Sequence, residues 1–277
     1  MFPTELIDII TDHLHDDWSA LRVCTLVSRT WTVSARYHLF RHISIPLASS
    51  DGDSDLREAV RSFESPLGKQ YGAYVRLCTV KALGTLFYWM KEPCIDLVTL
   101  GQLLSSLPRL GTLRLINIAW PAPSIRLPAS LASTSVTSLV VCRVESSQDY
   151  QQQYKTIRDG MAVLCLLPSL KSLTTLRSCW GASSLRDSYP SVEPSLFPHG
   201  LELETLDLRA DGPACILINY AIECLNFSAL TTLSIWSFYT EDIPSIGKLI
   251  RAAAHSLQSL ELRLTRLVFW DDPNDRE

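Results

Sequence analysis

One spacing of apolar residues recurs along most of the chain: an apolar residue, two others, an apolar residue, one other, and an apolar residue. Five good copies are LGTLRL from Leu110, VTSLVV from Val136, LETLDL from Leu203, LTTLSI from Leu230 and LQSLEL from Leu257. Two weaker copies are YVRLCT from Tyr74 and LKSLTT from Leu170. The starts at 74, 110, 136, 170, 203, 230 and 257 are 26 to 36 residues apart, a period that is typical of solenoid proteins.

Each copy predicts a short strand, because its last two apolar residues alternate and therefore point to the same side. Helical spacing precedes several copies, most clearly over 95–107, and comparable stretches lie at 157–167, 215–225 and 243–254. We therefore predict an α/β fold in which residues 71–277 form an irregular leucine-rich-repeat-like solenoid. Its parallel short strands would lie on one face and its helices on the other. The alternative is an ordinary α/β domain in which the leucines match by chance.

The repeats depart from the usual leucine-rich pattern after each strand. That pattern has Asn or Cys eight residues after the first leucine, where the side chain satisfies backbone groups of the loop. Here the corresponding residues are Ile118, Val144, Ser178, Asp211, Phe238 and Thr265. We therefore expect irregular turns and uneven curvature.

The first 45 residues have helical spacing. Leu6, Ile9, Ile10 and Leu14 fall on one face of a first helix. Ser19 is a candidate cap for a second helix that contains Leu21, Cys24 and Val27, and a third helix is expected over 31–40. Three helices in some forty residues form a unit too small to be very stable alone, so it should pack on a partner or on the repeats. Residues 46–70 cluster Gly, Pro, Ser and Asp and predict a linker, with a short helix near 56–63.

Composition and charge narrow the function. The chain has 277 residues, 47% apolar and 19% charged, with a formal net charge of −4, which is typical of a folded protein. Without a basic surplus, neither nucleic acid nor an anionic membrane is expected as the main partner. The opening is acidic and has no Lys or Arg before Arg22, unlike a secretory signal, and the apolar run at 161–167 is too short to span a bilayer. We therefore expect an intracellular protein of the cytoplasm or nucleus, with reduced cysteines.

Catalytic and cofactor motifs do not emerge. The chain contains no G-x-G dinucleotide fingerprint, and neither of its Gly-Lys pairs completes a phosphate-binding loop. The cluster HLHDD at 13–17 is more typical of a solvated helix end than of a metal site, because its two His would project in different directions. We therefore expect a non-catalytic protein with no cofactor.

The N-terminal residues carry a recognisable combination of motifs. It consists of Phe2-Pro3, Glu5-Leu6, Ile9, Ile10, Leu14, Leu21, Cys24, LVSRTW at 26–31 and the stretch from Tyr37 to Phe40. This combination resembles an F-box, particularly the F-box-like proteins abundant in mushroom-forming fungi, a family that also commonly carries leucine-rich repeats after the box. The resemblance covers roughly 45 of the 277 residues.

The resemblance implies a substrate-recognition adaptor of an SCF-type cullin–RING ubiquitin ligase. Its N-terminal helices would bind a Skp-family adaptor, and its repeats would bind a protein substrate. Carried over by position, the adaptor-facing residues are Pro3, Leu6, Ile9, Ile10, Leu21 and Val27. Leu14, Cys24 and Trp31 would instead hold the three helices together. The alternative for each adaptor-facing residue is packing against the chain's own repeats.

Substrate contacts are expected from outward positions beside the L-x-L strands. The candidates are Arg114, Asp207, Arg209, Ser234, Trp236, Glu261 and Arg263. Mixed charge around a tryptophan suits a protein surface, although a solvated sheet face has the same composition. The alternative function is a leucine-rich-repeat protein-binding scaffold with no ligase link, in which the helices only cap the first repeat.

Overall fold

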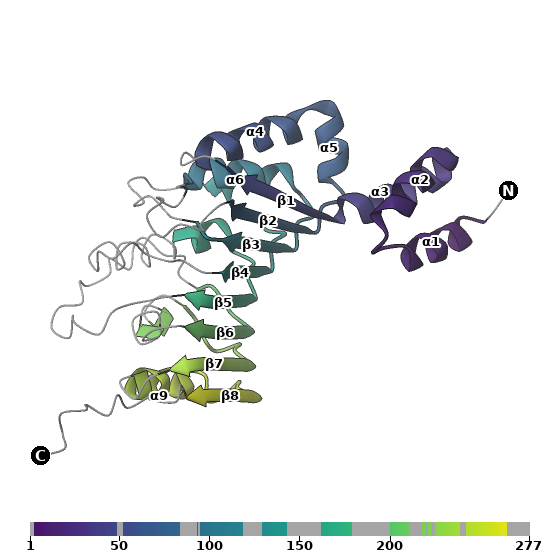
Figure 1. Ribbon diagram of the computed structural model, residues 1–277. Coiled ribbons are helices and arrows are strands. Elements are labelled where there is room, and N and C mark those ends of the chain that lie inside the picture. The colour runs from purple at the N-terminus through teal and green to yellow at the C-terminus, as the bar shows by residue number, and fades with distance from the viewer. Residues whose placement is uncertain are drawn as a thin grey trace, which may run out of the picture.

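The computed structural model describes residues 3–48, 52–83, 93, 95–118, 129–142, 162–178, 200–210, 218–219, 221–222, 225–238 and 242–264. Its centre is one parallel sheet of eight strands that lie side by side in chain order (Figure 1). The strands are β1 His42–Leu47, β2 Leu77–Ala82, β3 Thr112–Ile116, β4 Ser138–Cys142, β5 Ser172–Ser178, β6 Thr205–Ala210, β7 Thr232–Phe238 and β8 Ser259–Leu264. The predicted α/β class and solenoid-like arrangement are thus observed.

The helices carry the labels of Figure 1. They are α1 Thr4–His13, α2 Trp18–Val27, α3 Arg29–Arg41, α4 Gly52–Glu64, α5 Pro66–Gly72, α6 Leu97–Ser106 and α9 Ile243–Ala252. Two short 3-10 helices lie at η1 Ala129–Leu131 and η2 Ala162–Leu166. The predicted helices over 95–107 and 243–254 are confirmed as α6 and α9, whereas much of 157–167 and 215–225 lies outside the described residues.

All seven copies of the apolar phrase form strands, and the register shows why the spacing recurs. Leu113, Leu139, Leu173 and Leu206 are partners on successive strands and point into one core. Residues of α4, α6 and α9 bury their apolar faces in the same core. The strand β1 precedes the first copy and was not predicted. The alternation of Ile43, Ile45 and Leu47 in the sequence could have indicated it.

A regular backbone ladder joins the coils at the edge where the strands begin. The carbonyl of Arg76 accepts hydrogen bonds from the amides of Gly111 and Thr112, at 2.9 and 3.0 Å. The carbonyls of Gly111, Thr137, Lys171, Glu204 and Thr231 repeat this two-amide pattern. The coils are therefore closed regularly here without an asparagine ladder. The opposite edge, for which irregular turns are expected, lies largely outside the described residues.

The prediction that residues 46–70 form a linker is wrong. The segment contains the end of β1, all of α4 and most of α5, and Leu56 and Val60 are buried in the main core. The helical spacing of Leu56, Ala59, Val60 and Phe63 outweighs the turn-forming composition around it, because burial stabilises the helix against the sheet. The repeat unit therefore begins at β1, inside the predicted N-terminal unit of residues 1–45.

The helices α1, α2 and α3 form a small unit with a core of its own. Leu21, Cys24 and Ala35 are buried there, and Leu14, Trp31 and Leu39 pack against them. This confirms that Leu14, Cys24 and Trp31 hold the three helices together. The cap of α2 is Asp17, whose carboxylate accepts from the amides of Ser19 and Ala20, so the prediction of Ser19 as the cap is wrong by two residues.

The helical unit projects from the β1 end of the sheet (Figure 1). Polar contacts fasten α1 to α3: the Ser34 hydroxyl donates to the Asp8 carboxylate, and His38 Nε2 lies 3.0 Å from Asp12 Oδ1. At the other end of α3, the Phe40 ring stacks on the Tyr71 ring of α5 with 4.2 Å between centroids. The helix α3 therefore connects the unit to the solenoid and continues directly into β1.

Candidate protein-binding surfaces

The helix α1 carries apolar residues on two sides. Ile7 and Thr11 are buried, and Leu14 packs into the helical core. Leu6, Ile9 and Ile10 are exposed by 46%, 52% and 37%, and Pro3 before the helix is also exposed. The predicted apolar face is thus mostly uncovered, because a different spacing of residues makes the contacts with α3. The alternative, in which Leu6, Ile9 and Ile10 pack against the chain's own repeats, is not observed among the described residues.

The helix α2 adds further exposed apolar residues and one correction. Val27 is 60% exposed, as expected for a partner-facing residue. Leu21 is fully buried in the core of the helical unit, so its assignment to the adaptor-facing surface is wrong for the folded unit. Val23 and Leu26, exposed by 61% and 84%, were not among the predicted adaptor-facing residues, although both are apolar residues of a helix.

Exposed apolar side chains concentrate in the helical unit. Of the thirteen large hydrophobic residues that are exposed in the described parts of the chain, eight lie between Leu6 and Val33. We call Leu6, Ile9, Ile10, Val23, Leu26 and Val27 the N-terminal apolar set. Concentrated exposed apolar residues mark interaction surfaces, because a monomer gains nothing by leaving them in water.

The seven predicted substrate-binding residues all lie on the sheet face opposite the core. On β3, β6 and β7 their positions alternate with buried aliphatic residues, as in Arg114 between Leu113 and Leu115, whereas Leu260 and Leu262 beside them on β8 are 46% and 40% exposed. Six of the seven come together on adjacent strands, where Arg209, Trp236 and Arg263 are register partners on β6, β7 and β8. The seventh, Arg114, lies on β3 and is separate from the others.

We call Asp207, Arg209, Ser234, Trp236, Glu261 and Arg263 the Arg–Trp cluster. The guanidinium carbons of Arg209 and Arg263 lie 4.3 and 3.6 Å from the centroid of the Trp236 ring. Since the two arginines come from strands on either side of β7, they cover opposite faces of the indole. The arrangement is a double cation–π contact, which holds three long side chains upright on the sheet.

Each side chain of that row is also tied to the residue two positions earlier on its own strand. Arg209 Nη2 lies 2.9 Å from Asp207 Oδ2, and Arg263 Nη2 lies 2.8 Å from Glu261 Oε1. Trp236 Nε1 donates to the Ser234 hydroxyl at 2.6 Å. The hydrogen bond from Arg209 to Asp207 raises the pKa of that guanidinium further above its ordinary value. On each of the three strands, a hydrogen-bond acceptor is followed two residues later by the donor that binds it. These bonds hold the side chains of the cluster in place before any ligand binds.

A second group of cations lies where α3 meets the sheet. Burial, together with the positive charges of Arg41 and Arg114, lowers the pKa of His42 below its ordinary value. Within the described residues, no ion pair involves Arg41 or Arg114. The sequence did not point to Arg41 and His42, because only the fold brings them near Arg114.

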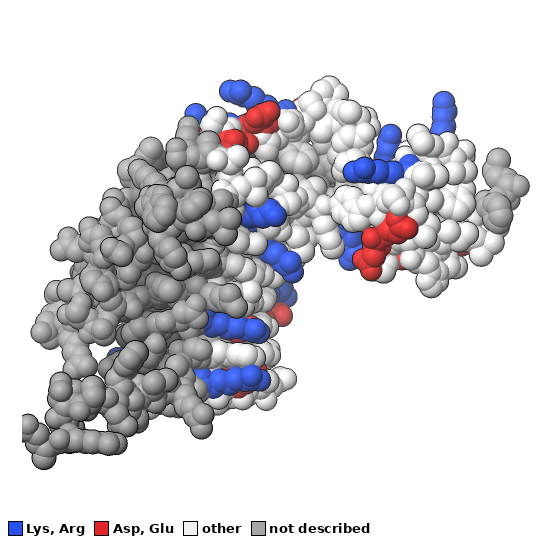
Figure 2. Space-filling model, in the orientation of Figure 1, with Lys and Arg blue, Asp and Glu red and all other residues white. Residues whose placement is uncertain are grey.

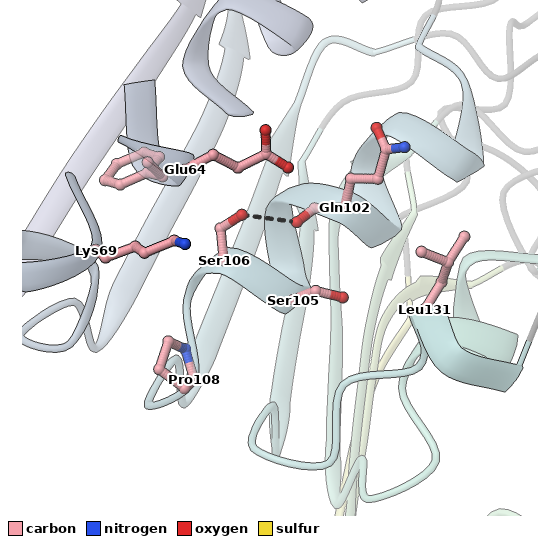
Figure 3. Close-up of a pocket in the computed structure, with 8 residues that line it drawn as sticks. Glu64, Lys69, Gln102, Ser105, Ser106, Pro108 and Leu131 are labelled. Atoms are coloured by element: carbon pink, nitrogen blue, oxygen red, sulfur yellow. Dashed lines mark hydrogen bonds between the residues drawn. The ribbon is translucent and has the colours of Figure 1, made fainter. Parts of the chain in front are cut away.

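A shallow hollow of about 620 Å³ opens on the helical side of the molecule, between α5 and α6 (Figure 3). Its lining comprises Phe63, Glu64, Lys69, Gln102, Ser105, Ser106, Pro108 and Leu131. The Ser106 hydroxyl there is engaged with the carbonyl of Gln102 at 3.0 Å. The hollow combines one cation and one carboxylate with neutral groups and offers no nucleophile paired with a base.

The described cysteines, metal-ligating residues and helices add no reactive thiol, metal site or membrane span. Burial raises the pKa of Cys78 to about 12 and also raises the pKa of Cys142 and Cys165, which makes all three poor nucleophiles. In the described ranges, no three His, Cys, Asp or Glu side chains gather as a metal site. None of the described helices has the length and apolar character needed to cross a bilayer.

Comparison with known proteins finds no matching family model and no matching curated protein.

Proposed function

We propose that this protein is a substrate-recognition adaptor of an SCF-type cullin–RING ubiquitin ligase. Its N-terminal helices bind a Skp-family adaptor protein, and the outer face of its sheet binds a protein substrate. The protein itself is not catalytic: it raises the local concentration of substrate lysines around a ubiquitin thioester that the ligase carries.

The observation that supports adaptor binding is the N-terminal apolar set on a unit that already has its own core. Leu14, Cys24 and Trp31 complete that core, so Leu6, Ile9 and Ile10 are not needed to hold the helices together. Exposure of these side chains to water is unfavourable. Their burial by a partner would be favourable by roughly 25 cal/mol for each Å² of apolar surface. The projection of the unit away from the sheet leaves room for such a partner (Figure 1).

The connection between the two parts suits the same function. The ring stack of Phe40 on Tyr71 and the guanidinium of Arg36, 5.6 Å from the Tyr71 ring centroid, attach α3 to α5. The helix α3 then passes into β1 without an intervening loop. A partner on α1 and α2 would therefore be held in a defined orientation relative to a substrate on the sheet, which ubiquitin transfer requires.

Co-purification with a Skp-family adaptor tests the proposal. The full chain is co-expressed with the adaptor, once as wild type and once as the double variant Leu6→Asp/Ile10→Asp. We expect the wild-type chain to capture the adaptor and the double variant to lose at least nine-tenths of that capture, because two charges would be placed against an apolar partner. Circular dichroism checks that the variant keeps its helices.

A matched control separates loss of the interface from loss of solubility. Ile243→Asp changes a residue that is 52% exposed at the start of α9, where a carboxylate is favourable at a helix N-terminus. This variant should capture as much adaptor as wild type. If wild type captures no adaptor, or if Leu6→Asp/Ile10→Asp captures as much as wild type, the ligase link is refuted and a protein-binding scaffold is the function left.

A further inference from the structure

The outer face of the sheet is more basic than the chain as a whole. Its described strand residues include four cations, Lys81, Arg114, Arg209 and Arg263, against two carboxylates, Asp207 and Glu261. The whole chain has a formal net charge of −4. Figure 2 shows Lys and Arg side chains recurring down the strands of the sheet, with few acidic side chains among them. This face therefore has a positive electrostatic potential although the protein as a whole is acidic, and a positive potential attracts anionic groups.

Within the described residues, the Arg–Trp cluster leaves hydrogen-bond donors unused at one end of this face. Asp207 binds Arg209 through Nε and Nη2, and Glu261 binds Arg263 through the same two nitrogens. In the described part of the chain no contact uses Nη1 of either arginine. The guanidiniums are already held by the indole and the carboxylates, so a ligand carboxylate would bind them with little loss of side-chain entropy.

Arg41 and Arg114 form the cationic group at the other end, and His42 lies beside them. Arg41 and His42 are consecutive at the junction of α3 with β1, and Arg114 on β3 lies in register with Thr79 and Ser44, two residues beyond His42. Arg114 is exposed and, like Arg41, has no carboxylate partner among the described residues. Cations without a counter-charge repel one another, and an anionic ligand would relieve that repulsion.

The surface between the two cationic groups is uncharged, and on β4 and β5 its outward residues are polar Ser138, Ser172 and Thr174 and apolar Val140, Cys142 and Leu176. Ile116, Val140, Cys142 and Leu176 occupy outward positions on β3, β4 and β5, and all four are half-buried. From β3 to β7 is four strand spacings, which is roughly 19 Å at about 4.8 Å for each spacing. An extended chain rises about 3.3 Å per residue, so roughly six residues bridge this distance.

We propose that the outer face of the sheet binds an extended segment of a partner protein with Asp or Glu residues at both ends and apolar residues between them. The segment crosses the strands, with one acidic end at Arg114 and the other at the Arg–Trp cluster, and its apolar middle covers Val140 and Cys142. That the segment belongs to a ubiquitylation substrate rests on the proposed function. The binding itself does not.

Carboxylates fit this face better than phosphates do. Asp207 and Glu261 lie within hydrogen-bond distance of the two arginines of the cluster, and they would repel a phosphate dianion more strongly than a single carboxylate. A nucleic acid would place a phosphate at every nucleotide, against a neutral middle that offers no cation. The spacing of charge along the face therefore favours an acidic protein segment.

Fluorescence anisotropy with the purified full-length chain tests the inference. The probe is a labelled pool of ten-residue peptides with two Asp or Glu at each end and six varied apolar or small residues between them. Three comparison pools carry Asn and Gln, Lys, or phosphoserine at the same end positions. We expect the acidic pool to bind at least tenfold more tightly than the amide pool, and its affinity to fall as salt rises from 50 to 500 mM.

Three variants localise the binding. Arg114→Gln and the double variant Arg209→Gln/Arg263→Gln each remove charge at one end and should weaken the acidic pool about tenfold. Arg251→Gln removes the same charge from the exposed end of α9, on the helical side, and should leave the affinity unchanged. Equal binding of the acidic and amide pools, preference for the phosphoserine pool, or wild-type affinity in the Arg114 and Arg209/Arg263 variants would each overturn the inference.

The two proposals fail separately. Leu6→Asp/Ile10→Asp should lose the Skp-family adaptor and keep the acidic peptides, whereas Arg114→Gln and Arg209→Gln/Arg263→Gln should keep the adaptor and lose the peptides. A chain that binds the peptides but no adaptor refutes only the ligase link. A chain that binds the adaptor but shows no preference for acidic peptides refutes only the inference about the sheet.

Discussion

Leu56→Ala examines whether α4 is part of the solenoid. Leu56 is fully buried in the main core, in a helix that packs on β1 and α6. The change removes three carbon atoms, worth about 2.4 kcal/mol at about 0.8 kcal/mol for each buried methylene. The cavity left behind adds to that loss, so we expect the free energy of unfolding to fall by about 3 to 4 kcal/mol. This is a large share of the roughly 5 to 15 kcal/mol that stabilises an ordinary domain.

Urea denaturation followed by circular dichroism measures the total loss, and hydrogen exchange locates it. In a solenoid each coil contacts mainly its neighbours, so the loss should be concentrated at one end. Amides of α4, β1 and β2 should exchange faster in Leu56→Ala, whereas amides of β7 should keep their wild-type rates.

The matched control is Leu67→Ala, which makes the same chemical change at a residue that is 55% exposed on α5. It should change the free energy of unfolding by less than about 0.5 kcal/mol, as is usual for surface positions. If Leu56→Ala costs no more than Leu67→Ala, then α4 does not contribute to the core, and the assignment of residues 46–70 to the solenoid fails.

Three further predictions concern single side chains. The Thr175 hydroxyl is buried without a hydrogen-bond partner in the described structure, so Thr175→Val should raise the free energy of unfolding by about 1 kcal/mol in urea titration, and a decrease would show that the hydroxyl is satisfied. The pKa of Cys78 at about 12 leaves almost no thiolate at pH 8, so a thiol reagent should label Cys78 only after unfolding, as mass spectrometry of labelled peptides would show; rapid labelling of the native chain would contradict its burial. The amides of Ala20 and Ser19 and the Ser19 hydroxyl lower the pKa of Asp17, so its stabilisation of α2 should be fully present above the ordinary carboxyl pKa and be lost as pH falls through the lowered pKa. Exchange of the Ala20 amide in an acid titration measures this, and an Asp17→Ala variant should show no such transition.

The strands illustrate what periodicity alone predicts well. Buried leucines at alternate positions recur because the same two rows point into the core on successive coils, so a spacing such as LETLDL is visible before any contact is known. The repeat count was one strand short because β1 has a different phrase, HISIPL, with Pro46 at an outward position. The linker prediction failed because turn-forming composition says nothing about the burial of Leu56 and Val60.

The candidate surfaces illustrate the limit of positional reasoning. A helix presents several apolar residues, and the sequence does not say which of them meet the neighbouring helix. Leu6 and Leu21 were both assigned to a partner surface, yet Leu6 is 46% exposed and Leu21 is fully buried. Only the packing of α1 and α2 on α3 separates them, because each helix can be rotated about its axis without changing its spacing.

By itself the sequence determined the alternation that makes the strands, the helical spacing that makes α6 and α9, and the outward position of Arg209, Trp236 and Arg263, because these depend on periods of two and 3.6 along the chain. Tertiary structure alone decided that Arg209 and Arg263 enclose Trp236 and that Arg114 comes close enough to act on His42. These contacts join residues of different coils, and the length of each coil, rather than any local pattern, sets which residues meet. Local periodicity fixes the direction of a side chain, and coil stacking chooses its neighbours.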